Sequence, residues 1–175
     1  MKKLKAAIYA LTFAVAMCFT FQCASSKVAT TFQKEIPFNI EDVYFQEWYA
    51  GIKVGGTGVN IFIPVVDKPT DVIVDSVYFR NLQGKLVKTQ GKYSAVLKNK
   101  SRTYTFRIED KPEGYPFDLK ANECVISYIQ NGETKYYKIQ QLNEFAGTYY
   151  ENGPPSIYVR ESSEGLATLD EENDN

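Results

Sequence analysis

The chain has 175 residues, of which 44% are hydrophobic and 23% are charged, and this is enough apolar material for one ordinary core. Its formal net charge of -1 argues against a dedicated nucleic-acid binder. Because it contains no histidine, Ser-His-Asp and Cys-His catalysis and zinc sites that use imidazole are excluded. We therefore expect one domain with no cofactor, no metal and no nucleic-acid partner, and we expect that it is not an enzyme.

Residues 1–22 are predicted to be a secretory signal. Met1-Lys2-Lys3-Leu4-Lys5 gives a positively charged start, and residues 6–21 form an apolar or small-residue run without a charge. The run approaches the roughly 20 residues that a membrane span needs, so a retained N-terminal anchor is the alternative. The cysteine that follows the run favours the cleaved signal.

That cysteine lies in the sequence TFQCASSK, residues 20–27. The arrangement resembles a bacterial lipoprotein signal, in which cleavage leaves a lipid-modified cysteine as the first mature residue. Gln22 stands where the common lipobox has a small residue, and the looser lipobox of Bacteroidetes-type lipoproteins fits better. The resemblance implies that Cys23 is the lipid anchor. The alternatives are Cys18, which would leave apolar residues 19–21 at the mature start, and a chance cysteine in an ordinary signal.

Residues 23–35 are polar and suit a tether, and residues 36–160 have the pattern of an all-β domain. Short segments rich in Val, Ile, Tyr, Phe and Thr are separated by Gly, Pro, Asn and Asp, without a convincing helical repeat. This favours an immunoglobulin-like antiparallel β-sandwich of eight or nine short strands, with a small β-barrel as the alternative. Strands are expected at Val43–Tyr49, Gly58–Pro64, Val72–Arg80, Lys85–Thr89, Tyr93–Leu97, Thr103–Ile108, Cys124–Gln130 and Glu133–Gln140, with Ser156–Arg160 as a further edge strand.

The clearest local signal is a hairpin over residues 123–140. Asn131-Gly132 favours the positive φ angles of a two-residue type I′ turn. Such a turn fixes five cross-strand pairs: Tyr128–Lys135, Ile126–Tyr137, Cys124–Ile139, Ser127–Tyr136 and Val125–Lys138. The first three pairs form a mostly apolar face. The last two are predicted to form the wetter face of a sheet that is covered on one side only.

Glycines punctuate two other regions. GIKVGGTGVN, residues 51–60, lacks the spacing of a phosphate loop or a dinucleotide fingerprint, and it leads into a strand rather than a helix. Its glycines are therefore predicted to permit left-handed turns or bulges, and a mobile binding loop is the alternative. Gln83-Gly84 and Gln90-Gly91 are predicted turns of a meander.

Few residues are candidates for catalysis or metal binding. Cys124 lies in an alternating strand pattern, which indicates a small core residue rather than a nucleophile. Glu109-Asp110 and Glu113 lack the spacing of a calcium-binding EF-hand loop. A hydrolase with two carboxylates across a cleft is the remaining catalytic alternative.

Aromatic residues make up 14% of the chain, and several are adjacent in sequence. In a strand, one member of an adjacent pair faces outward. We therefore take Trp48, Tyr49, Tyr136, Tyr149 and Tyr150 as the possible binding surface, on which rings could stack against a sugar or contact a protein. The alternative is that these aromatics only reflect the preferences of β-strands.

The mature domain is similar to small uncharacterised β-sandwich lipoproteins of Bacteroidetes-type bacteria, with residues 47–60 as its most individual feature. This likeness implies no known activity. We expect a lipid-anchored envelope protein that contacts a protein partner or scaffolds an assembly, with a glycan-binding module as the alternative. Residues 24–27 contain no acid, which favours an outer-membrane anchor facing the periplasm. Residues 161–175 are expected to be an acidic, disordered tail.

Overall fold

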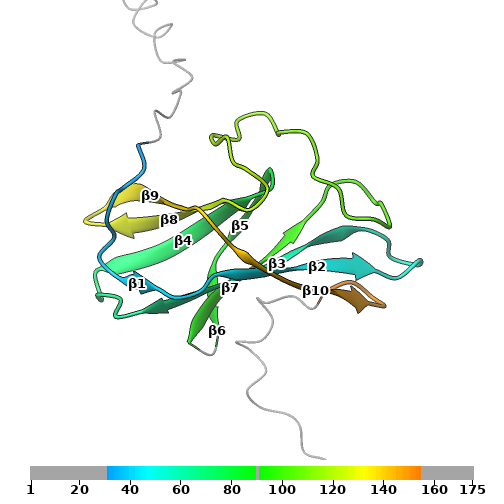
Figure 1. Cartoon of the computed structure of the whole chain (residues 1–175), viewed down its shortest axis with the longest axis horizontal. Helices are drawn as coiled ribbons and strands as arrows, with labels where there is room; N and C mark the ends of the chain where they lie inside the picture. The colour runs from blue at the N-terminus through cyan, green and yellow to red at the C-terminus, as the bar shows by residue number, and fades with distance from the viewer. Residues whose placement is uncertain (1–30, 90, 155–175) are drawn as a thin grey trace, which may run out of the picture.

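Figure 1 shows the computed structural model, which describes residues 31–89 and 91–154. The signal, Cys23, the Ser156–Arg160 segment and the tail lie outside the described residues. Within the described part the chain forms strands and no helix. The strands are β1 (Asn39–Ile40), β2 (Tyr44–Ala50), β3 (Thr57–Val66), β4 (Val72–Phe79), β5 (Leu82–Lys85), β6 (Val87–Thr89), β7 (Lys92–Lys98), β8 (Cys124–Gln130), β9 (Glu133–Ile139) and β10 (Asn143–Tyr150).

Two sheets make up the fold. The first has the order β10-β2-β3-β7-β6, with β1 paired to β3, and the second has the order β5-β4-β8-β9. In immunoglobulin lettering, β2-β3-β7-β6 corresponds to A-B-E-D and β5-β4-β8-β9 to C′-C-F-G. The predicted immunoglobulin-like sandwich is confirmed, and the sheets are not closed into a barrel.

The core lies between the inner faces of the two sheets. Period-2 alternation along β3 turns Val59, Ile61 and Ile63 inward, where they are fully buried. Ile126 of β8 and Val77 of β4 meet them from the second sheet. Burial of these branched side chains, which suit strands, is the main stabilising contribution to such a fold.

The predicted hairpin is confirmed in turn type and register, but its outer face is not wet. Asn131 and Gly132 have φ angles of 54° and 78°, and all five expected pairs are formed. Val125 and Ser127, however, are 0% and 2% exposed. Phe117, from the connection that precedes β8, packs over Val125 on that face. The sequence pattern could not reveal this cover because it comes from a segment without regular structure.

That connection, residues 99–123, also contains the one predicted strand that is wrong. Thr103–Ile108 pairs with no strand in the described part of the chain. Side-chain amides take the place of a neighbouring strand there: Asn99 Nδ2 donates to the Arg107 carbonyl at 3.1 Å, and Asn81 Nδ2 donates to the Glu109 carbonyl at 2.8 Å. Composition favoured a strand, but tertiary contacts determine the backbone partners.

Three further differences concern strand ends. Gln83-Gly84 is not a turn but part of β5, because the turn from β4 is made by Arg80 and Asn81, with φ angles of 48° and 63°. The expected strand Lys85–Thr89 is divided between the two sheets, since the chain changes sheet at Leu86. The C-terminal strand β10 was not predicted. It is parallel to β2, whereas the other strand pairs are antiparallel (Figure 1).

Candidate functional site

The five aromatic residues predicted as a binding surface do not form one. Trp48 in β2 is only 1% exposed, so its assignment to a binding surface is wrong. Its ring packs over Gly58, the residue opposite it in β3, and a Cβ atom at position 58 would overlap that ring. The adjacency rule required only that one of Trp48 and Tyr49 face outward. Trp48 points away from the core between the sheets, but its side chain is covered and is not accessible.

Tyr49 belongs to a charged network instead of a free surface. Its hydroxyl donates to Glu47 Oε2 at 2.6 Å, and Glu47 Oε1 accepts a hydrogen bond from Arg80 Nη1 at 2.7 Å. The hydrogen bond to Glu47, followed by burial, raises the pKa of Tyr49 to about 12. The Arg80 guanidinium lies 4.5 Å from the centre of the Phe45 ring, and its Nε donates to the Ala121 carbonyl at 3.0 Å. This network joins β2, the turn after β4 and the connection before β8, which indicates a structural role.

Tyr136 lies on the other sheet from Trp48 and Tyr49. It is half-buried in an aromatic cluster on the outer face of the second sheet, with its ring 5.4 Å from Phe117 and 6.4 Å from Tyr78. Its ring is therefore occupied by internal packing.

Tyr149 and Tyr150 lie in β10, and only Tyr149 is freely accessible. Tyr149 is 65% exposed, whereas the Tyr150 hydroxyl accepts a hydrogen bond from Asn60 Nδ2 at 3.1 Å. Sequence reasoning missed Phe145 of β10, which is 53% exposed and lies 4.7 Å from the ring of Tyr44 at an angle of 63°. Phe145 was not identified as a candidate because β10, the strand that contains it, was not predicted.

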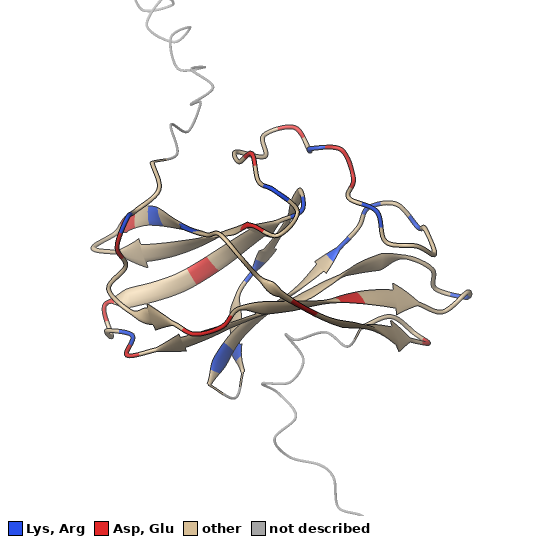
Figure 2. Cartoon of the chain, in the orientation of Figure 1, with Lys and Arg blue, Asp and Glu red and all other residues tan. Residues whose placement is uncertain are grey.

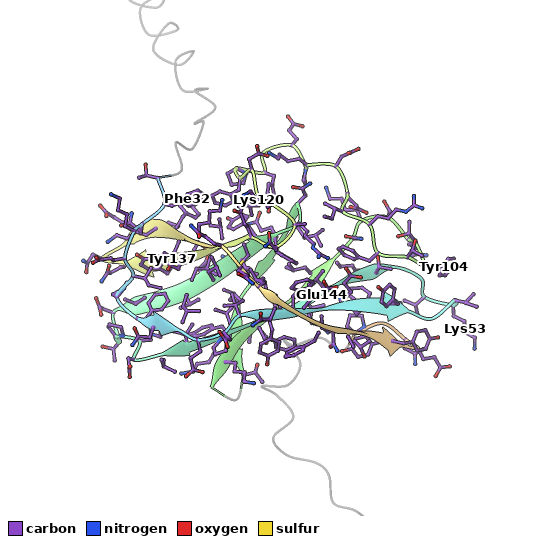
Figure 3. All side chains as sticks on the ribbon, in the orientation of Figure 1. Phe32, Lys53, Tyr104, Lys120, Tyr137 and Glu144 are labelled. Carbon is purple, nitrogen blue, oxygen red and sulfur yellow. The ribbon has the colours of Figure 1, made fainter. Side chains whose placement is uncertain are left out.

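The outer edge of β10 is a poor site for pairing with another strand. A bulge between Phe145 and Thr148 interrupts its register against β2. At that bulge Gln46 Nε2 donates to the Ala146 carbonyl at 2.8 Å, and Glu144 adds a charge in the same strand (Figure 3). Bulges and charges are devices that protect sheet edges from pairing.

A hollow in the described part of the chain lies beside β9, the edge strand of the other sheet. We call it the β9 groove, and its cavity volume is about 840 Å³. Figure 3 labels Phe32 and Tyr137 on this side of the molecule. Three chain segments line the groove, at residues 32–34, 40–43 and 137–143, namely Phe32, Gln33, Lys34, Ile40, Glu41, Asp42, Val43, Tyr137, Lys138, Ile139, Gln140, Gln141 and Asn143.

The backbone of β9 is open along this groove. In a two-residue hairpin, alternate residues of β9 direct their backbone groups toward β8, and those between them face the opposite edge. The Gln33 amide donates to the Tyr136 carbonyl at 2.8 Å across that edge. The backbone groups of Tyr136 therefore point away from β8. Lys138 then faces the same way, and we infer the same for Gln140, the residue that directly follows the end of β9. Among the described residues, neither makes a backbone hydrogen bond on this side.

The groove combines an apolar floor with an acidic wall. Ile40, Tyr137 and Ile139 pack against the main core and are only partly covered. Lys138 Nζ forms an ion pair with Glu123 Oε2 at 2.7 Å. The hydrogen bond from the Lys120 amide, followed by the one from Lys138, keeps the pKa of Glu123 below its usual range. The charged residues that line the groove are Lys34, Lys138, Glu41 and Asp42, which balance. Because Glu123, outside the lining, pairs with Lys138, one negative charge is left over when Glu123 is included. Figure 2 shows acidic residues along the segment that leads from β1 into β2.

The described residues offer little for catalysis. They contain no group of three or more potential metal ligands. The Cys124 thiol is fully buried, and burial raises its pKa, so it does not supply a thiolate. Ser127 Oγ lies 3.3 Å from Asp75 Oδ2, but Ser127 is buried in the sheet, where a substrate would not reach it.

No helix within the described residues is long and apolar enough to cross a membrane. A scan against protein-family models, a search of curated proteins and a search of solved structures each found no match to this chain.

Proposed function

We propose that the chain is a lipid-anchored envelope protein whose immunoglobulin-like domain binds a protein partner through the β9 groove and carries out no catalysis itself. The observation that supports this proposal is the groove: an open strand edge beside partly covered apolar side chains. Such a combination suits a peptide or loop of another protein, since backbone hydrogen bonds and apolar contacts can form together.

The proposed anchor places the groove close to the membrane. Phe32, which lines the groove, follows Cys23 by nine residues. Even a fully extended chain covers at most about 3.3–3.6 Å per residue, so lipidation at Cys23 would hold the groove within about 30 Å of the bilayer surface. The partner would accordingly be another protein of the same membrane, or one that reaches its surface.

Glycan binding is the alternative function, and the aromatic geometry supports it less. Sugar recognition would be favoured by a row of exposed, coplanar rings on one sheet face. The exposed rings of β10 are Phe145 and Tyr149, and Phe145 stands at 63° to its neighbour Tyr44. A glycan array with the purified protein tests this alternative directly.

Site-specific photo-crosslinking tests the protein-binding proposal. A benzophenone amino acid replaces Gln141, an exposed residue of the groove, in the full-length chain expressed in the cells that encode it. The control carries the same amino acid at Thr70, an exposed loop residue between β3 and β4. We expect a discrete protein adduct from position 141 and not from position 70. Equal labelling at both positions, or none at position 141, would contradict a binding site in the groove.

A further inference from the structure

We propose that the partner binds by strand addition: an extended segment of the partner protein pairs with the open edge of β9 and places a lysine or arginine against Glu41 and Asp42. This inference rests on the proposed function, to which it adds the mode of binding and the chemistry of the partner segment.

The backbone of β9 presents hydrogen-bonding groups at the correct spacing. Tyr137 and Ile139 lie in hydrogen-bonded positions opposite Ile126 and Cys124, so their N–H and C=O groups are used within the sheet. Lys138 lies between them, so its backbone groups point away from β8 toward the groove that it lines. Gln140, which directly follows β9 and also lines the groove, is the next position in this alternation. Two outward positions separated by one residue are the repeat that an added strand requires.

The chain itself demonstrates that an extended segment fits this edge. Phe32 forms an isolated parallel bridge with Tyr136, and the Gln33 amide donates to the Tyr136 carbonyl at 2.8 Å. The pairing stops there, because the chain then leads away toward β1. A partner segment beside Lys138 and Gln140 would continue the pairing that Phe32 begins.

The side chains around the edge indicate what such a segment carries. Side chains of an added strand alternate, so every second residue would contact the apolar floor formed by Ile40, Tyr137 and Ile139. The acidic wall at Glu41 and Asp42 stands beside a lysine, Lys138, that Glu123 already neutralises. A basic residue in the partner segment would complement this excess negative charge.

Peptide selection tests the inference without knowledge of the partner. Full-length protein, purified in detergent, is used to select binders from a phage library of random ten-residue peptides, and a selected peptide is then measured by fluorescence anisotropy. We expect selected sequences that contain lysine or arginine and alternate with apolar residues. Gln140→Pro removes one outward N–H and should weaken binding roughly fivefold or more, the effect of one lost hydrogen bond.

Two matched controls separate the groove from general damage. Thr134→Pro makes the same change at an outward position of β9 on the other side of the Phe32 bridge, so affinity should stay within about twofold. Glu41→Gln combined with Asp42→Asn leaves the backbone intact and should weaken binding while reducing its dependence on salt.

The outcomes distinguish this inference from the proposed function. A selected peptide that binds equally well to the Gln140→Pro protein, or is indifferent to the two carboxylates, would overturn strand addition by a basic segment. Failure to select any groove-dependent peptide, while position 141 still crosslinks to a partner, would also overturn it and leave the proposed function standing. Loss of the crosslink as well would contradict both.

Discussion

Replacing Gly58 with alanine should destabilise the domain, although strand preference alone predicts the opposite. Glycine within a strand is less favourable than alanine by roughly 0.5–1 kcal/mol, so an unconstrained position would become more stable. Here a Cβ atom would overlap the carbonyl oxygen of Leu97 and the ring of Trp48. Overpacking costs up to about 3 kcal/mol, and the backbone oxygen belongs to a paired strand that cannot move alone. Subtracting the gain leaves a net loss of about 2 kcal/mol.

Urea unfolding of the protein from residue 24 onward measures this loss. Trp48 is the only tryptophan, so its fluorescence reports both the unfolding and the packing over Gly58. Gly114→Ala is the control, because Gly114 has a φ of 78° and no atom within 4 Å of the place that a Cβ would occupy, so it should lose about 1 kcal/mol through backbone strain alone. Only Gly58→Ala should also alter the fluorescence of the folded state. A neutral or stabilising Gly58→Ala would refute the packing of Trp48 on β3.

Four further outcomes are expected. Ile126→Asp should unfold the domain by burying an unpaired charge. Ser127→Asp should also be strongly destabilising, because Ser127 is buried beside the carboxylate of Asp75. A thermal melt in which either variant is tolerated would contradict the assigned burial. The pKa of Tyr49 in the folded protein, about 12, exceeds its ordinary value of 10.0. The contribution of Tyr49 to stability should therefore be complete below about pH 10 and decline as the pH rises toward 12. Tyr49→Phe should remove this part of the pH dependence of urea unfolding. Cys23→Ser should abolish incorporation of an alkyne fatty acid in a bacterial host, whereas Cys18→Ser should not, and the reverse result would move the anchor. Neither EDTA nor a reductant should lower the melting temperature, because apolar packing holds the core; a large decrease with either would reveal a metal or disulfide dependence.

Local sequence signals predicted those parts of the fold that depend on local geometry. Asn131-Gly132 determined the turn, the turn determined the register of β8 and β9, and alternation identified the inward residues of both strands. Prediction failed where segments that are distant in sequence determine the strand pairing and the hydrogen-bond partners of the backbone. β10 is parallel to β2 and contains a bulge, so its sequence lacks clean alternation. Thr103–Ile108 has the composition of a strand, but the side-chain amides of Asn99 and Asn81 donate to the carbonyls of Arg107 and Glu109 in place of a neighbouring strand.

The candidate site could not be predicted for the same reason. The β9 groove is assembled from two parts of the chain that are far apart in sequence, residues 32–43 and residues 137–143. Aromatic content directed attention to Trp48 and Tyr49 instead, and alternation required only that one of the two face outward. In the structure the Trp48 ring lies against Gly58, a close approach that only the pairing of β2 with β3 reveals.

Amide hydrogen exchange shows whether the β9 edge is open in the free protein and whether a bound peptide pairs with it. In the free protein, the amides of Lys138 and Gln140 should exchange within about an order of magnitude of unstructured-peptide rates, while those of Tyr137 and Ile139, which pair with β8, should be strongly protected. Addition of a selected peptide should protect Lys138 and Gln140 as well. If these two amides are already slow to exchange in the free protein, or stay fast when the peptide is bound, the β9 edge is not the binding site.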